Sequence, residues 1–142
     1  GATHIINAAK EKSPRKKALE INGGRGVDYA FVTAPSAAAE VQAFNMLDMV
    51  GTEVLIGFPA FGETVSLPAG LIVQGRKVIG SAMGHSRLAW DIPRLVKMYK
   101  IGKLKLDELV SGTYSLEQVN EAVESTARGE ALRNVIVFDV DK

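Results

Sequence analysis

The stretch VDYAFVTAPSAAAEVQAFNMLDMVGTEVLIG, residues 27–57, contains two hydrophobic periodicities in succession. Val27–Val32 and Thr52–Gly57 are short and nearly continuously apolar, which is typical of strands buried on both faces of a parallel sheet. Between them, Ser36 can cap a helix that carries a buried apolar stripe. The stripe consists of Val41, Phe44 and Leu47. Strand, helix and strand in this order predict an α/β fold with parallel strands.

The same alternation continues along the rest of the chain. Further strands are predicted at His4–Asn7, Lys77–Ala82 and Asn134–Val140. One helix is predicted from the N-cap Ser13 and Pro14 to a stop at Gly23-Gly24, and a shorter helical run at Leu67–Gln74. An amphipathic helix is predicted from Asp91 to Gly102. A last helix begins with a capping box at Ser115–Gln118 and stops at Gly129. Together they predict a parallel sheet whose strands are joined by helices.

Composition excludes several classes of protein. The chain has 142 residues, 46% of them hydrophobic, which is enough for one domain with a core of its own. Its net charge of +1, from 17 basic and 16 acidic side chains, favours neither nucleic acid nor a membrane surface. The absence of cysteine excludes disulfides and thiolate metal sites, and no apolar run reaches the roughly 18 to 20 residues that span a bilayer. We expect a soluble, cytoplasmic protein.

No single motif specifies a catalytic centre. Gly23–Gly26 follows a predicted helix and precedes a strand, so it is interpreted as a helix stop and not as a phosphate cradle. Gly57–Gly62 has the spacing of a nucleotide-binding loop, but Glu63 follows where that loop requires lysine. His4 and His85 are too few for a catalytic zinc site, although His85 follows a predicted strand, where ligands gather in α/β sheets.

A cluster of basic side chains lies near the start of the chain. It comprises Lys10, Lys12, Arg15, Lys16 and Lys17. No aromatic residues are interleaved with them, which favours a solvated helix face over a nucleic-acid surface. The residues alone therefore predict a ligand-binding α/β domain without a glycine-rich phosphate loop.

Eight segments occur in order along residues 1–139. They are GATHIIN, GGRGVDYAF, GTEVLIGFP, GETVSLP, KVIGSAMG, DIPRLVKMYKIGKLKLDELV, YSLEQVNEAVE and GEALRNVIVFD. This ordered set resembles the C-terminal part of the medium-chain, zinc-dependent alcohol dehydrogenases. The resemblance implies an incomplete Rossmann-like, doubly wound parallel sheet. Residues 1–82 would be the C-terminal portion of a nucleotide-binding domain, and residues 83–142 the C-terminal segment of the catalytic domain.

The resemblance also implies that the sequence begins partway through a fold. In that family a GAT segment follows two strands that carry the G-x-G-x-x-G turn and the acidic residue for the adenosine ribose. Neither feature is present here. The zinc ligands would lie further upstream still, so we expect a C-terminal fragment of a longer enzyme.

The cofactor positions that the resemblance implies lie at strand ends. They are Thr33, Ala34, Ile56, Gly57, Phe58, Ser81, Met83 and Arg133. Residues 56–58 would lie against the nicotinamide, and the backbone of Ser81 and Met83 would hold its carboxamide. Arg133 would pair with the diphosphate, for which a guanidinium fork is well suited. The implied cofactor is NAD or NADP, and no residue of this chain is assigned to catalysis or to a metal.

The implied activity is hydride transfer between an alcohol or aldehyde and the nicotinamide, with zinc bound by the parent enzyme only. This chain alone is expected to be inactive and to bind the cofactor weakly. A zinc-free quinone or enoyl reductase of the same superfamily is an alternative, as is a non-catalytic α/β nucleotide-sensing or oligomerisation module. We expect a homodimer through the strand Lys77–Ala82. With two strands missing, we also expect Ile5 and Ile6 to pack against Val27–Val32, within one chain or across two.

Overall fold

The computed structural model describes residues 2–138, which form parts of two compact units, Gly1–Ser86 and Arg87–Lys142. The first unit contains a three-stranded, wholly parallel sheet in the order β1-β2-β3. Its strands are β1 (Val27–Val32), β2 (Leu47–Leu55) and β3 (Lys77–Gly80). The predicted α/β class with parallel strands is therefore confirmed.

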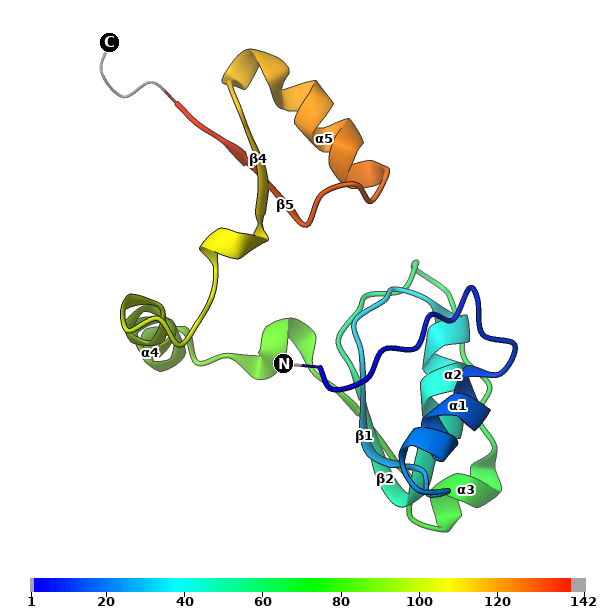
Figure 1. Cartoon of the computed structure of the whole chain (residues 1–142). Helices are drawn as coiled ribbons and strands as arrows, with labels where there is room; N and C mark the ends of the chain where they lie inside the picture. Colours follow the sequence, from blue (N-terminus) through cyan, green and yellow to red (C-terminus); the bar gives the residue numbers. More distant parts are fainter. Residues whose placement is uncertain (1, 139–142) are drawn as a thin grey trace. The chain divides into compact units, whose positions relative to one another are not determined.

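Three helices flank this sheet on one side (Figure 1). They are α1 (Pro14–Ile21), α2 (Ala37–Met46) and α3 (Ala69–Val73), and a short 3-10 helix, η1 (Ala82–His85), follows β3. The predicted caps are confirmed: the hydroxyl of Ser13 accepts a hydrogen bond from Lys16 N at 3.3 Å, and that of Ser36 accepts one from Ala39 N at 3.4 Å. Gly23 and Gly24 follow α1 with φ of 66° and 87°, so the predicted stop is also confirmed.

The core of this unit lies between α2 and the sheet. Phe44 is fully buried and Leu47 is 2% exposed, as predicted, whereas Val41, the third member of the predicted stripe, is only half-buried. Leu47 belongs to β2, however, which begins five residues before the predicted Thr52 because the register with β1 shifts near its start. On the opposite face of β1, Tyr29 and Phe31 are 64% and 65% exposed, with their rings stacked 6.3 Å apart.

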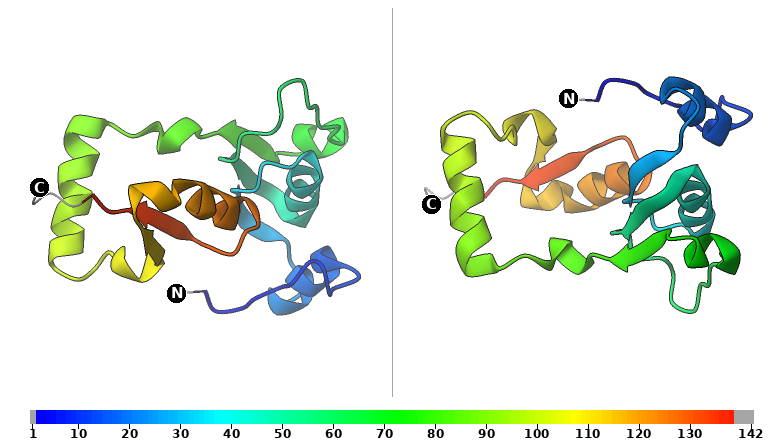
Figure 2. Two further views of the ribbon diagram at one scale, coloured as in Figure 1. Left: turned by 90° about the horizontal axis from the view of Figure 1, so that it is seen from above. Right: turned by 90° about the horizontal axis from the view of Figure 1, so that it is seen from below.

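The predicted first strand, His4–Asn7, is wrong. Residues 2–7 form no strand, Ile5 is 90% exposed, and both views in Figure 2 show this segment running apart from the strands. The carbonyl of Asn7 instead accepts hydrogen bonds from Lys10 N and Glu11 N, and its side-chain oxygen accepts one from Ala9 N. A local turn thus replaces the strand, since an extended segment gains stability only with a partner.

Within the chain, the expected strand of residues 4–7 beside Val27–Val32 is absent and Ile5 is exposed, whereas packing of Ile5 and Ile6 against Val27–Val32 across two chains stays a prediction. Among the described residues β1 pairs only with β2, and its other edge carries no strand.

The second unit pairs a helix with a two-stranded parallel sheet. Its elements are α4 (Leu88–Lys100), η2 (Asp107–Leu109), β4 (Val110–Tyr114), η3 (Leu116–Gln118), α5 (Val119–Ala127) and β5 (Arg133–Ile136). The helix α5 packs against β5, and Asn134 Nδ2 donates to the Ala122 carbonyl at 2.8 Å. The capping box at Ser115 is confirmed, although its first turn is 3-10.

Several boundaries differ from the predictions in this unit. The helix α4 begins at Leu88, three residues before the predicted Asp91. The strand β4 was not predicted. The predicted strand Asn134–Val140 corresponds to β5, which begins at Arg133 and ends at Ile136, and Val140 lies outside the described residues. Within residues 2–138, no helix combines the length and apolar character needed to cross a membrane.

Candidate functional site

The carboxyl ends of β1, β2 and β3 meet at one edge of the first sheet. Just past β2, the N–H groups of Ile56 and Gly57 both donate to the Val32 carbonyl at the end of β1, at 2.9 and 3.0 Å. Just past β3, Ser81 N donates to the Leu55 carbonyl at 2.8 Å. The ladder thus continues past the ends of β2 and β3 and brings the segments that follow these two strands beside the end of β1. In open α/β sheets this edge is where ligands bind.

Gly57 makes the closest approach at this edge. A Cβ placed there would lie 2.7 Å from the carbonyl carbon and oxygen of Ala34, and 2.8 Å from the Thr33 oxygen. Real Cβ atoms do not approach backbone so closely, so any side chain would push the β1–α2 loop outward. The three predicted residues Thr33, Ala34 and Gly57 are therefore in direct contact, and only glycine permits it.

The segment after β3 holds an unusual backbone. Met83, Gly84 and His85 have φ values of 50°, 72° and 48°, three left-handed residues in a row. Met83 and His85 are not glycines, and such conformations concentrate at functional sites. The turn is fixed by Gly84 N donating to the Ser81 carbonyl at 3.3 Å and by the Ser86 hydroxyl donating to the Met83 carbonyl at 3.2 Å. Sequence reasoning singled out Met83 and His85 but not this conformation.

Two predicted side chains at this edge project away from the protein core. Phe58 is 76% exposed and Met83 is 91% exposed. An exposed aromatic ring and an exposed thioether can both pack against an apolar ring of a ligand.

Arg133 is the predicted residue that the first unit does not contain. It begins β5 in the second unit, where it pairs in register with Val110 and is exposed. Its N–H lies 3.5 Å from the Ser111 hydroxyl. No salt bridge engages its guanidinium within residues 2–138.

A pair of buried carboxyl groups lies beneath α2, and sequence reasoning missed it. Glu53 in β2 is 1% exposed and Glu40 in α2 is 5% exposed. Neither carboxyl oxygen of Glu53 has a hydrogen-bond partner among the described residues. Burial, and then the nearby charge of Glu40, raise the pKa of Glu53 to about 7. In the sequence, Glu53 lies inside the predicted strand Thr52–Gly57, whose apolar neighbours indicate burial, but Glu53 was not singled out.

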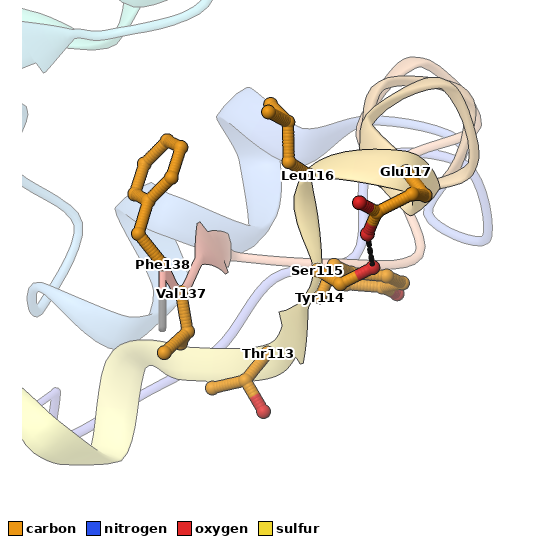
Figure 3. Close-up of a pocket in the computed structure, with 7 residues that line it drawn as sticks. All are labelled: Thr113, Tyr114, Ser115, Leu116, Glu117, Val137 and Phe138. Carbon is orange, nitrogen blue, oxygen red and sulfur yellow. Dashed lines mark hydrogen bonds between the residues drawn. The ribbon is translucent and has the colours of Figure 1, made fainter. Parts of the chain in front are cut away.

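The second unit has a cavity of about 570 Å³ (Figure 3). It is lined by Thr113, Tyr114, Ser115, Leu116, Glu117, Val137 and Phe138, and by none of the sequence-predicted site residues. The Ser115 hydroxyl donates to a Glu117 carboxylate oxygen at 2.6 Å, and this bond holds the pKa of Glu117 below its ordinary value. Because Ser115 also belongs to the capping box of η3, the pair is assigned to helix capping and not to nucleophilic chemistry.

Metal-ligating side chains do not converge in the part of the chain that the structure describes. No group of three histidine, aspartate or glutamate residues lies close enough there to hold an ion, and the sequence has no cysteine. The donor set that zinc requires is thus not supplied by these residues.

Comparison with known proteins identifies the family. Residues 1–99 match the family described as zinc-binding dehydrogenase. An NDMA-dependent alcohol dehydrogenase of Amycolatopsis methanolica is 35% identical over 99% of this chain, and a geraniol dehydrogenase of Carpoglyphus lactis is 33% identical over 97% of it. The chain spans 38% and 36% of the length of these two relatives.

Solved structures agree with this similarity. The benzyl alcohol dehydrogenase of Acinetobacter calcoaceticus superposes with a TM-score of 0.88 at 29% identity, covering 96% of this chain and 37% of that one. Sequence and fold lead to one conclusion: the chain belongs to the zinc-binding dehydrogenase family, among the alcohol dehydrogenases of the medium-chain dehydrogenase/reductase superfamily.

Proposed function

We propose that the carboxyl edge of β1, β2 and β3 forms the nicotinamide side of an NAD or NADP site in an alcohol dehydrogenase. The observation that carries the proposal is the convergence of Thr33, Ala34 and Gly57 with the segment that begins at Ser81. These residues come from the ends of three parallel strands, where open α/β sheets bind their ligands.

Each group at this edge has a role that its chemistry supports. The backbone groups of Ser81 and Met83 bind the carboxamide of the nicotinamide, and the exposed ring of Phe58 covers one apolar surface of the cofactor. Arg133 belongs to the second unit and not to this edge; its guanidinium fork is proposed for diphosphate oxygens on its chemistry alone. When bound, the nicotinamide supplies the hydride chemistry, accepting a hydride from an alcohol or returning it to an aldehyde.

Residues 1–82 are proposed to be the C-terminal portion of a nucleotide-binding domain, and residues 83–142 the C-terminal segment of a catalytic domain. Zinc is proposed for the enzyme as a whole. The described residues of this chain do not supply a set of zinc ligands. The alternative is a zinc-free quinone or enoyl reductase of the same superfamily. Activity on alcohols and aldehydes would favour the alcohol dehydrogenase, and activity on quinones alone would favour the reductase.

A homodimer through β3 is proposed as the assembly. The strand β3 lies at the edge of the three-stranded sheet, and all four of its residues are exposed. Such an edge presents unpaired N–H and C=O groups to a second chain, and a pairing of two β3 strands would satisfy them.

The experiment uses the protein encoded by the whole reading frame that contains these residues. Reduction of NAD and NADP is followed with alcohols, and oxidation of the reduced cofactors with aldehydes and quinones. Gly57→Ala is expected to weaken cofactor affinity by about tenfold or more, because the added Cβ displaces the Thr33–Ala34 loop. Gly70→Ala is the matched control, since a Cβ at Gly70 meets nothing within 4 Å. Equal cofactor affinity in the two variants, or activity on quinones alone, would contradict the proposal.

A further inference from the structure

A second recess in the first unit is strongly basic. It is a cavity of about 440 Å³ lined by residues from the start of α1, from α2 and from α3. These three helices are labelled in Figure 1. Its polar lining consists of Lys12, Ser13, Arg15, Gln42, Asn45 and Arg76. Three of these six side chains are cationic and none is acidic, so the lining has a net charge of +3.

Two guanidinium groups are held in place at this cavity by the carboxyl end of α2. Arg15 Nε donates to the Asn45 carbonyl at 2.8 Å, and Arg76 Nη1 donates to the Phe44 carbonyl at 2.8 Å. Arg76 also lies over the Phe44 ring, with its guanidinium carbon 5.4 Å from the ring centroid. The two cations are thus positioned by backbone and packing contacts before any ligand arrives.

The positive charge is only partly compensated by the protein. Burial, and then the charge of Arg15, lower the pKa of Arg76, which indicates that the two guanidiniums repel one another. Asp48 opposes this effect, but its carboxylate is already paired with Arg25 at 2.9 Å. Among the described residues, Lys12, Arg15 and Arg76 form no salt bridge.

The cavity also has donors that remain unused. A guanidinium has five N–H donors, and only one from each arginine is used on a carbonyl. A tetrahedral oxyanion would accept from several of these donors at once and would remove the repulsion between the two cations.

We propose that this cavity binds a small phosphate-bearing anion. The site is distinct from the cofactor edge, because α2 starts beside that edge at Ser36 and ends at the cavity, ten residues or about 15 Å away. A bound phosphate would join α1 to the end of α2 and to Arg76, the residue that precedes β3. Two residues of the basic cluster near the start of the chain, Lys12 and Arg15, line the cavity and would contact the anion. Lys16 and Lys17 do not line the cavity.

The test is a calorimetric titration of the complete chain with inorganic phosphate, pyrophosphate and adenosine monophosphate at constant ionic strength. Arg15→Gln and Lys12→Gln are expected to weaken binding by about tenfold each, the loss of one charge-assisted contact. Lys16→Gln, which removes the same charge from a neighbouring position outside the cavity, is expected to change affinity by less than about twofold. Circular dichroism verifies that each variant is folded.

The outcomes separate the alternatives. Equal affinities for phosphate and adenosine monophosphate assign the site to the free anion. Tighter binding of adenosine monophosphate assigns the site to a phosphate monoester. Either result supports the proposal when Arg15→Gln lowers the measured affinity. No saturable binding of any of the three probes would overturn it. Equal weakening by Lys16→Gln and Arg15→Gln would also overturn it, because it would indicate unspecific attraction to positive charge.

Discussion

Replacing Glu53 by glutamine should make the first unit more stable at neutral and alkaline pH. The Glu53 carboxyl is buried in β2 without a hydrogen-bond partner among the described residues, and its charged form is disfavoured first by burial and then by Glu40. Glutamine has nearly the same shape and stays neutral at every pH. The variant therefore removes the cost of ionising this position and leaves the packing beneath α2 in place.

The magnitude follows from the pKa in the two states. The pKa rises from 4.5, the ordinary value, to about 7 in the folded protein, a difference of about 2.5 units. At about 1.4 kcal/mol per unit, ionisation of Glu53 costs the folded state about 3.5 kcal/mol. For an acid with a raised pKa, this cost is absent below about pH 4.5, grows as the pH rises to about 7, and is constant above.

The assay is urea unfolding followed by far-ultraviolet circular dichroism from about pH 4.5 to about pH 8. The free energy of unfolding of Glu53→Gln should match the parent at the acidic end and exceed it by up to about 3.5 kcal/mol at the alkaline end. Glu40→Gln is the control and should give a smaller gain, because the charge of Glu40 is the lesser cause of the shift. A constant difference between Glu53→Gln and the parent across this range would refute the reasoning.

Two further predictions concern packing and assembly. Phe44→Ala should lower the free energy of unfolding by about 3–5 kcal/mol, since Phe44 is fully buried. Phe58→Ala should change it by less than about 1 kcal/mol, because that ring is 76% exposed. Similar losses for the two variants in urea unfolding would contradict the assignment of the core. Light scattering should show a dimer that Ile79→Pro dissociates, because proline removes a ladder donor from the exposed strand β3, and a dimer that survives the substitution would exclude pairing through this strand.

The helical parts of the fold were predictable because their signals are local. Ser13 and Ser36 cap the helices that follow them, and Ser115 begins a capping box, as their neighbouring residues predicted. A strand, in contrast, depends on a partner that its own residues do not specify. His4–Asn7 has a strand-like sequence and no partner in the described structure, while Val110–Tyr114 pairs with β5 although Ser111 and Gly112 interrupt its apolar pattern.

The candidate site was predictable only through the family resemblance. Nothing local to Thr33, Ala34 or Gly57 distinguishes them from ordinary strand ends, and their contact depends on the order of strands in the sheet. The burial of Glu53 and the grouping of Arg15 with Arg76 depend in the same way on residues far apart in the sequence.

The central claim is that the carboxyl edge of the first sheet binds the nicotinamide end of the cofactor. It is tested most directly by titrating the isotopically labelled chain with NAD and mapping the backbone amide shifts by nuclear magnetic resonance. A few backbone and charge-assisted contacts give weak binding, of about millimolar affinity. We predict that the largest shifts occur at Thr33, Ala34, Ile56–Phe58, Ser81 and Met83. Shifts confined to the region of Lys12 and Arg15, or no shifts at the sheet edge at saturating NAD, would contradict the claim.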